Sequence, residues 1–322
     1  MQKEFTTPAT PAGLIVLSLR LVAGWTYFSA FWRRLVLENK LDPDAPGYIG
    51  EKFNHFLPQA LGIKPIIQYL VSHPDLLHRS MWVFTIAEAI VGLCFMFGLM
   101  TRWMSVLVVS LAAGILLGAG WLGTTCLDEW QIGVLGIAAG FTVFVAGGGP
   151  VSLDHIFGRG RCLFYRQSIP LQNKKLVITG AIVITFLTLF TNQYFHGGVW
   201  GTLHNRSVKP VLEITNALIQ KDELVFEIQR IEGADVYGSF LIAVQIENDE
   251  GEIVFSKTGA ELSAASIVNS YVAKVKGGKY SLVIPLGAKA VLRFKDVRMP
   301  RGNYVLRLID VSGLEWTTTI DK

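Results

Sequence analysis

The 322-residue sequence is 51% hydrophobic and only 17% charged, whereas a typical soluble domain is about 25% charged. This shortage of charge indicates that part of the surface does not face water, and it excludes an intrinsically disordered chain. Three cysteines exclude a small disulfide-rich scaffold, and a net charge of +4 is too small to indicate a nucleic-acid partner. We therefore interpret the chain as a membrane protein.

Five apolar stretches are long enough to cross a bilayer, which takes about 20 helical residues. They are residues 12–31, 81–100, 103–122, 131–151 and 176–195. Arg20 is the only charged residue in the first stretch and Glu88 the only one in the second. The first stretch is not a cleavable signal peptide, because Arg33 and Arg34 stand where small residues should precede a cleavage site.

The loops predict an orientation. Five basic residues and one acidic residue lie between the fourth and fifth stretches, which predicts a cytoplasmic loop. The N-terminus is then inside, and everything after residue 195 is outside. The outer connection 32–80 is too long for a bare linker. Its portion 63–77 has apolar residues at helical spacing, so it is either an interfacial or re-entrant helix or a folded surface loop.

From residue 208 the hydrophobic pattern changes to a period of two, which is typical of β-strands. About eight short strands without a helical pattern predict an all-β sandwich of immunoglobulin-like type. We therefore expect a four-helix transmembrane domain over residues 1–170, a fifth transmembrane helix over 171–196 and an extracytoplasmic β-sandwich over 197–322. The expected strands are 208–214, 223–228, 237–247, 252–256, 280–284, 290–294, 303–308 and 315–320.

Charge is unevenly distributed along the β-rich half. Residues 213–261 contain eleven acids and three bases, whereas residues 274–307 contain nine bases and one acid. One interpretation is a basic face that points toward the membrane surface or toward an anionic substrate. The other is that both sheets carry scattered, solvated charges.

Charges inside a bilayer are costly, by about 2.5–3.5 kcal/mol at a helix centre on insertion scales. We therefore expect Arg20 and Glu88 to pair between the first and second spans. Such a pair would fix the packing of two helices, or it would form a polar site that binds an anion through Arg20 and moves protons through Glu88.

Cys126 is the most suggestive single residue, because it lies at the outer mouth between two uncharged spans and has no obvious disulfide partner. A thiolate can attack sulfur, but it needs a positive neighbour to lower its pKa. Asp128 and Glu129 would oppose ionisation of the thiol. The cations that could offset them from the outer connection are Arg33, Arg34 and Arg79.

No histidine lies in the middle of a span, which disfavours a haem held by two histidines between helices. The sequence also lacks a Cys-x-x-Cys-His run and the glycine patterns of nucleotide-binding folds. Any electron carrier is therefore expected to be diffusible and soluble in lipid, with no haem, flavin or metal implied.

Several runs resemble known membrane families. The run EAIVG at 88–92 followed by GLMTR at 98–102, with Arg20 and VSLD at 151–154, resembles the DoxX/DoxD family of small four-helix membrane proteins. GTTCLDEW at 123–130 is narrower and resembles DoxD, a subunit of thiosulfate:quinone oxidoreductase. TNQYFH at 191–196, GGVWG at 197–201, LHN at 203–205 and SVKP at 207–210 resemble DoxA, the other subunit. Nearly the whole chain thus resembles a DoxD–DoxA fusion.

The resemblance implies oxidation of two thiosulfates to tetrathionate, with two electrons passed to a membrane quinone. Our hypothesis places thiosulfate near Cys126, held by Arg20 or by an outer arginine, while Glu88 assists protonation of the quinone. The residues expected to contact substrate are Arg33, Arg34, Arg79, Asp128, Glu129, Trp130, Trp200, His204 and Asn205.

Two other functions stay open at this point. One is a non-enzymatic membrane anchor that presents the β-domain to a partner, which would leave Arg20, Glu88 and the 123–130 run unexplained. The other is a subunit of a different membrane redox complex acting on sulfur compounds. In each case we expect a multi-pass protein of a bacterial or archaeal cytoplasmic membrane, and a homo-oligomer is possible.

Overall fold

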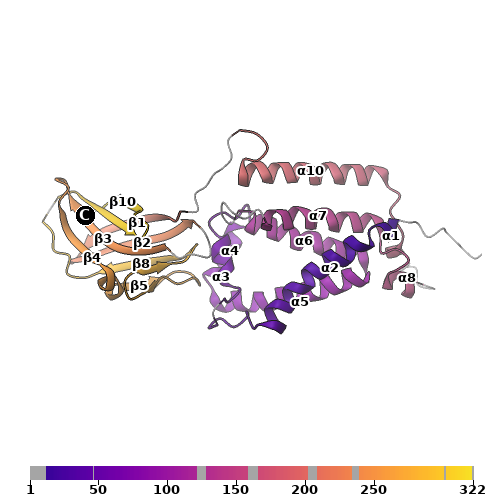
Figure 1. Ribbon diagram of the computed structural model, residues 1–322, viewed down its shortest axis with the longest axis horizontal. Helices are drawn as coiled ribbons and strands as arrows, with labels where there is room; N and C mark the ends of the chain where they lie inside the picture. Colours follow the sequence, from indigo (N-terminus) through magenta and orange to yellow (C-terminus); the bar gives the residue numbers. More distant parts are fainter. Residues whose placement is uncertain are drawn as a thin grey trace, which may run out of the picture. The chain divides into compact units, whose positions relative to one another are not determined.

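The computed structural model in Figure 1 describes residues 12–45, 47–121, 128–158, 166–201, 209–233, 239–300 and 302–320. These residues divide into two compact units. A helical unit comprises residues 12–49, 78–121 and 128–201, and a second unit comprises residues 50–77 and 209–320.

Among the described residues, four helices are long and apolar enough to cross a membrane. They correspond to the second to fifth predicted spans, although the second begins at Pro74 rather than at residue 81. Proline is favoured in the first turn of a helix. The first turns after Pro74 contain charged and polar residues, so the apolar pattern alone did not predict this start. The four helices are α5 (Pro74–Phe97), α6 (Thr101–Ala119), α7 (Asp128–Ala146) and α10 (Lys174–His196).

The first predicted span is a rod built from three pieces, α1 (Ala12–Ile15), α2 (Leu17–Phe31) and the π-helix η1 (Trp32–Leu37). Helical hydrogen bonds cross the interruption at Val16, from its N–H to the carbonyl of Ala12 and from Arg20 N–H to the carbonyl of Val16. The 15 residues of α2 extend about 22 Å, less than the roughly 30 Å of a hydrocarbon core. Residues 12–31, which join α1 to α2, extend about 30 Å, so this stretch needs α1 as well as α2 to match that thickness.

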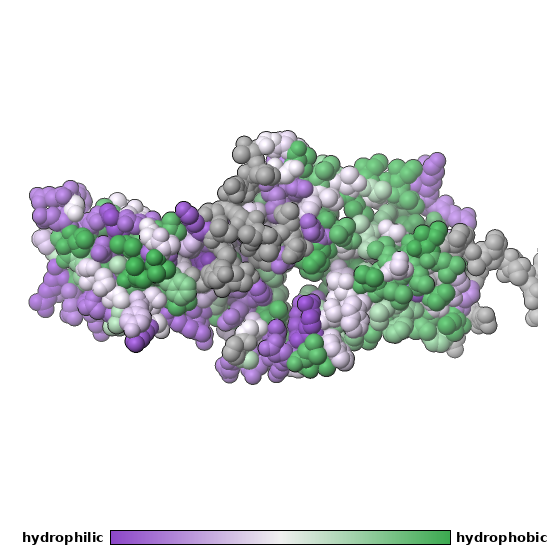
Figure 2. Space-filling view, in the orientation of Figure 1, coloured by the Kyte–Doolittle hydropathy of each residue, from purple (hydrophilic) through white to green (hydrophobic). Residues whose placement is uncertain are grey.

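The surface of the helical unit is largely apolar (Figure 2). α10 is the extreme case, because only 6% of its most apolar window is buried. Phe186 is 68% exposed and Ile182 63% exposed on this helix. Exposed apolar side chains in such density are expected where lipid is the solvent.

Asp154 ties the α7–α8 connection to the start of α6. It is fully buried on α8 (Leu153–Phe157) and accepts hydrogen bonds from the N–H groups of Met100 and Thr101 at 2.7 and 2.8 Å and from Thr101 Oγ1 at 2.6 Å. These are free N–H groups of a helix N-terminus, where a carboxylate is favoured by both hydrogen bonding and the helix dipole.

The β-rich part of the second unit contains two antiparallel sheets. One has the order β1-β2-β8-β5, and the other has the order β10-β9-β3-β7-β6 with β4 paired to β3. The eight predicted strands are present, and two short strands that were not predicted, β5 and β6, have four and two residues. The strands are β1 (Val211–Gln220), β2 (Glu223–Glu232), β3 (Ser239–Asn248), β4 (Ile253–Thr258), β5 (Ser266–Asn269), β6 (Lys276–Gly277), β7 (Leu282–Ile284), β8 (Lys289–Phe294), β9 (Tyr304–Asp310) and β10 (Glu315–Thr319), and a 3₁₀ helix η2 (Gly259–Ala264) follows β4.

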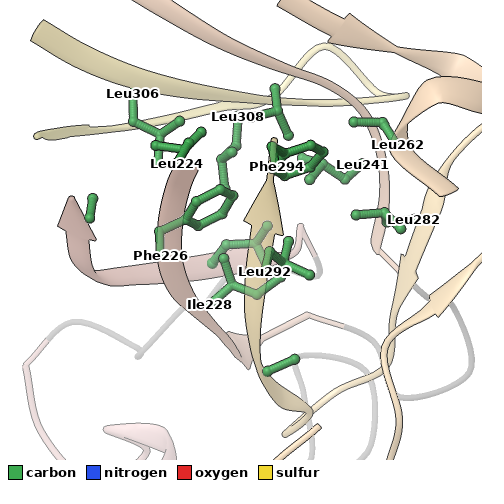
Figure 3. Close-up of a cluster of buried hydrophobic side chains, with 14 of the residues drawn as sticks. Leu224, Phe226, Ile228, Leu241, Leu262, Leu282, Leu292, Phe294, Leu306 and Leu308 are labelled. Carbon is green, nitrogen blue, oxygen red and sulfur yellow. The ribbon is translucent and has the colours of Figure 1, made fainter. Parts of the chain in front are cut away.

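The alternating apolar residues of both sheets meet in one hydrophobic core (Figure 3). Phe226 of β2 stacks on Phe294 of β8, with ring centroids 6.1 Å apart, and Leu306 and Leu308 enter from β9. Burying a side chain of this size contributes about 1.5–3 kcal/mol. The core therefore fixes which face of each strand points outward.

Strand pairing mixes the charges that are segregated along the sequence. β8, from the basic stretch, pairs with β2, from the acidic stretch. Lys289 Nζ lies 2.8 Å from Glu227, and Arg307 lies 2.8 Å from Glu247. These pairs favour the interpretation in which acids and bases are interspersed over the sheets.

The segment 50–77 packs with the β-strands in the second unit. It contains α3 (Glu51–Phe56) and α4 (Lys64–Val71), and α5 begins at Pro74, so the stretch 63–77, expected as a helix or a folded loop, is largely helical. Asn54 is fully buried; its amide donates to the Gly287 carbonyl at 3.3 Å and accepts from Ala273 N–H at 3.1 Å. Gly287 has φ of +74°, and a Cβ there would lie 1.8 Å from the Asn54 carbonyl oxygen. This contact therefore requires glycine.

Candidate functional site

Two glycines bring α2 and α5 into close antiparallel contact. A Cβ added at Gly92 would lie 2.5 Å from Phe28 N and 2.8 Å from Gly24 O, and one at Gly24 would lie 2.6–2.8 Å from Met96. Small residues permit such close backbone approach between membrane helices. This contact sets the register that decides which polar side chains meet.

The register places Arg34 beside Glu88. Arg34 Nη1 donates a hydrogen bond to Glu88 Oε2, and the Glu88 side chain is only 4% exposed while that of Arg34 is 21% exposed. The guanidinium also lies over the Phe84 ring, 5.9 Å from its centroid. Arg33 is exposed, donates from Nε to the Ser29 carbonyl at 3.3 Å and lies within electrostatic range of Glu88.

Both arginines belong to the π-helix η1. The wide turn of a π-helix is uncommon and is frequently found at functional sites. The sequence gives no pattern that distinguishes a π-turn from an ordinary helical turn, so the reach of Arg34 to Glu88 could not be predicted. Arg34 was expected to contact an anion on the outer side of the membrane. In the structure its partner is the buried carboxylate of Glu88.

Two further buried hydroxyls belong to the same helices and were missed in the sequence. Tyr27 of α2 is 4% exposed and Thr85 of α5 is 1% exposed, and neither hydroxyl has a hydrogen-bond partner among the described residues. Tyr27 lies within electrostatic range of Glu88. Its hydroxyl faces Gly136 of α7, where a Cβ would lie 2.5 Å from the oxygen.

The available signal was the spacing of these residues. Tyr27 follows Gly24 by three positions and precedes Arg34 by seven, and Thr85 precedes Glu88 by three, which places each set on one helix face. Leaving a buried hydroxyl unsatisfied costs about 1–3 kcal/mol. An arginine, a carboxylate and two such hydroxyls therefore form a buried polar centre with capacity to hold a proton and to hydrogen-bond an acceptor.

The expected pairing of Arg20 with Glu88 is wrong. Arg20 is 2% exposed, and its guanidinium donates to the carbonyls of Gly148 and Val151, the latter at 2.6 Å. It lies against Gly98, where a Cβ would be 2.6 Å from Nη1. Glu88 is ten residues from Gly98, about 15 Å along α5, so the antiparallel register separates the two charges. A role of Arg20 in anion binding stays a prediction.

The residues that flank the Cys126 segment form an aromatic cluster around His196. Its ring lies 5.2 Å from Trp121 and 5.8 Å from Trp130, and Trp130 Nε1 donates to Thr191 Oγ1 at 3.0 Å. The cluster joins the end of α6, the start of α7 and the end of α10. Trp130 thus has a defined setting, whereas its expected contact with substrate stays a prediction.

The other predicted site residues have separate positions. Arg79 is exposed at the start of α5, and Glu129 is half-buried at the start of α7. Trp200 is 67% exposed, and its backbone N–H donates to Gln193 Oε1 at 3.1 Å. Three residues (Cys126, His204 and Asn205) and the side chain of Asp128 lie outside the described part of the chain.

In the described residues, no group of three or more His, Cys, Asp or Glu side chains is arranged to hold a metal ion.

Family models match the chain in tandem. The model of the TQO small subunit DoxD matches residues 15–190, and that of the TQO small subunit DoxA matches residues 195–319. The DoxD match covers more than half of the chain and includes all of the polar residues on α2 and α5.

The chain belongs to the DoxD family. It continues as a DoxA part, so the resemblance to a DoxD–DoxA fusion is confirmed. DoxD and DoxA domains indicate subunits of a thiosulfate:quinone oxidoreductase. The DoxD part carries the apolar helices with the Arg34–Glu88 pair, and the DoxA part carries the two antiparallel sheets.

Proposed function

We propose that this DoxD–DoxA chain oxidises thiosulfate to tetrathionate on the outer face of the membrane and passes the electrons to a membrane quinone. The observation that carries the proposal is the buried Arg34–Glu88 pair in a chain matched by both subunit families. The same two helical segments carry the hydroxyls of Tyr27 and Thr85, which have no hydrogen-bond partner among the described residues. A buried, titratable carboxylate inside a membrane bundle is by default a functional group.

The reaction needs two protons on the quinone side. Two thiosulfates release two electrons when their sulfur–sulfur bond forms, and the quinone takes up these two electrons and two protons to become a quinol. Glu88 gives a proton to a quinone oxygen and is reprotonated from water at the Arg34 end. The Arg34 guanidinium stabilises the carboxylate between the two events, and the Tyr27 hydroxyl donates a hydrogen bond to the quinone oxygen.

On the thiosulfate side we propose that Cys126 is the nucleophile. Its thiolate and the first thiosulfate form a sulfur–sulfur bond and release two electrons toward the quinone. The second thiosulfate attacks that bond, tetrathionate leaves, and the Cys126 thiolate is regenerated. An outward-facing site suits a dianion that crosses membranes poorly.

The test is quinone reduction by the detergent-purified chain, with and without thiosulfate, with tetrathionate measured in the same sample. Two thiosulfates consumed for each quinol formed would support the reaction. Full turnover by Cys126→Ala would refute the covalent route and leave an electrostatic one. No reduction by a folded chain with several quinones would refute the proposed reaction and favour a different sulfur substrate or a non-enzymatic anchor.

A further inference from the structure

A polar cavity of about 260 Å³ lies within the second unit, where the segment 50–77 meets the sheet β1-β2-β8-β5. Its floor is a row of directly opposed residues on three strands, because Glu213 of β1 pairs with Gln229 of β2 and Gln229 pairs with Lys289 of β8. Opposed residues of neighbouring strands share one face of a sheet. Lys64 and Gln68 of α4 and Tyr271 complete the polar lining.

Hydrogen bonds from Asn54 and Gln59 hold the cavity walls in place. Asn54 bonds to the backbone at Gly287 and Ala273, and the Gln59 side-chain amide donates to the Ile231 carbonyl at 3.4 Å. Helices ordinarily meet a sheet through apolar side chains. This cavity is polar instead. Its volume has room for several water molecules, at about 30 Å³ each, or for one small polar ligand.

The lining is suited to an acceptor-rich ligand. Lys64 Nζ donates to the Pro58 carbonyl at 3.2 Å, and Lys289 Nζ donates to Glu227 at 2.8 Å. An ammonium group has three N–H donors, so both lysines retain donors for a ligand. The Gln229 amide and the Tyr271 hydroxyl add neutral donors. Among the described residues, Glu213 is the one carboxylate in the lining, and Glu227 contacts the lining residue Lys289.

We propose that this cavity binds a small sulfur oxyanion of the thiosulfate class. The identity of the ligand rests on the proposed function; the site itself rests on the cavity and its two lysines. Because residues 50–77 lie in the DoxD match and the strands in the DoxA match, the site needs both family parts. That requirement gives a physical reason for the two parts to be present together.

The experiment is equilibrium binding of sodium thiosulfate to the full-length purified chain, by calorimetry without quinone. Lys64→Gln and Lys289→Gln should each weaken binding about tenfold, as expected for loss of one charge-assisted hydrogen bond. Glu213→Gln should tighten binding several-fold because it removes the opposing charge. Lys295→Gln is the matched control, since Lys295 is exposed after β8 and is not part of the lining.

Saturable binding that is weakened by both lining variants and unchanged by Lys295→Gln would support the site. Absence of binding, equal losses in Lys295→Gln, or weaker binding in Glu213→Gln would overturn it. Lys64 is exposed, so its variant should fold even if Lys289→Gln does not. Binding without turnover would refute the proposed reaction alone, and turnover without this binding would refute the site alone.

Discussion

Replacing Glu88 with Gln separates the proton chemistry of the polar centre from its contribution to stability. Gln keeps the volume and one acceptor oxygen of Glu, but it removes the charge and the transferable proton. A positioned acid or base contributes typically 10²–10⁴-fold to a rate. We therefore expect Glu88→Gln to lower quinone reduction about 100-fold or more.

The burial of the Arg34–Glu88 pair also predicts the stability of Glu88→Gln, of Arg34→Gln and of the double variant that carries both substitutions. Removing one partner of a buried ion pair costs about 3–5 kcal/mol, and Arg34, which is 21% exposed, places this pair near the lower end. Arg34→Gln should therefore destabilise the chain by about 3 kcal/mol, because Glu88 is left buried without its cation. The double variant should recover about 2 kcal/mol of that loss, within the usual range of coupling for contacting residues.

The assays are thermal unfolding in detergent and quinol formation, both on the two single variants and the double variant. The expected combination is recovery of stability in the double variant without recovery of turnover. Glu88→Gln turnover within threefold of the unmodified chain would show that Glu88 carries no proton to the quinone. Additive stability losses would show that the two side chains do not act as a pair.

Three further predictions concern packing and pH. Gly92→Ala should lower stability by about 1–3 kcal/mol through overpacking, whereas Gly114→Ala, with no atom within 4 Å of the new Cβ, should be neutral or stabilising in the same thermal assay. Asn54→Ala should cost about 2–4 kcal/mol in urea unfolding, because two buried backbone groups lose their partner, and no change would contradict its role in docking the segment 50–77. The hydrogen bond from Lys289 to Glu227 raises the pKa of Lys289, and burial raises the pKa of the Tyr48 phenol. Both groups hold their protons more tightly in the folded chain, so their contribution to stability should persist at neutral pH and be lost as pH rises above about 10; stability that increases over that range would refute the assignment.

The division into apolar helices and alternating strands could be predicted from the sequence alone. That information is local, because helical and strand periodicities repeat within a few residues. Eight of the strands and the four long helices were therefore predictable, as was the DoxD–DoxA resemblance carried by short runs. The short strands β5 and β6 were not predicted.

Partners between elements were decided only by the tertiary structure. Arg20 and Glu88 are the single charges of the first two predicted spans, yet the glycine contact of α2 with α5 sets a register in which Glu88 pairs with Arg34 instead. In the β-strands, pairing of β8 with β2 places Lys289 next to Glu227 although the two lie in oppositely charged stretches. The docking of Asn54 onto the strands also joins distant parts of the chain. A partner across elements depends on register and approach distance, which arise when side chains of both elements pack together, and no local pattern encodes them.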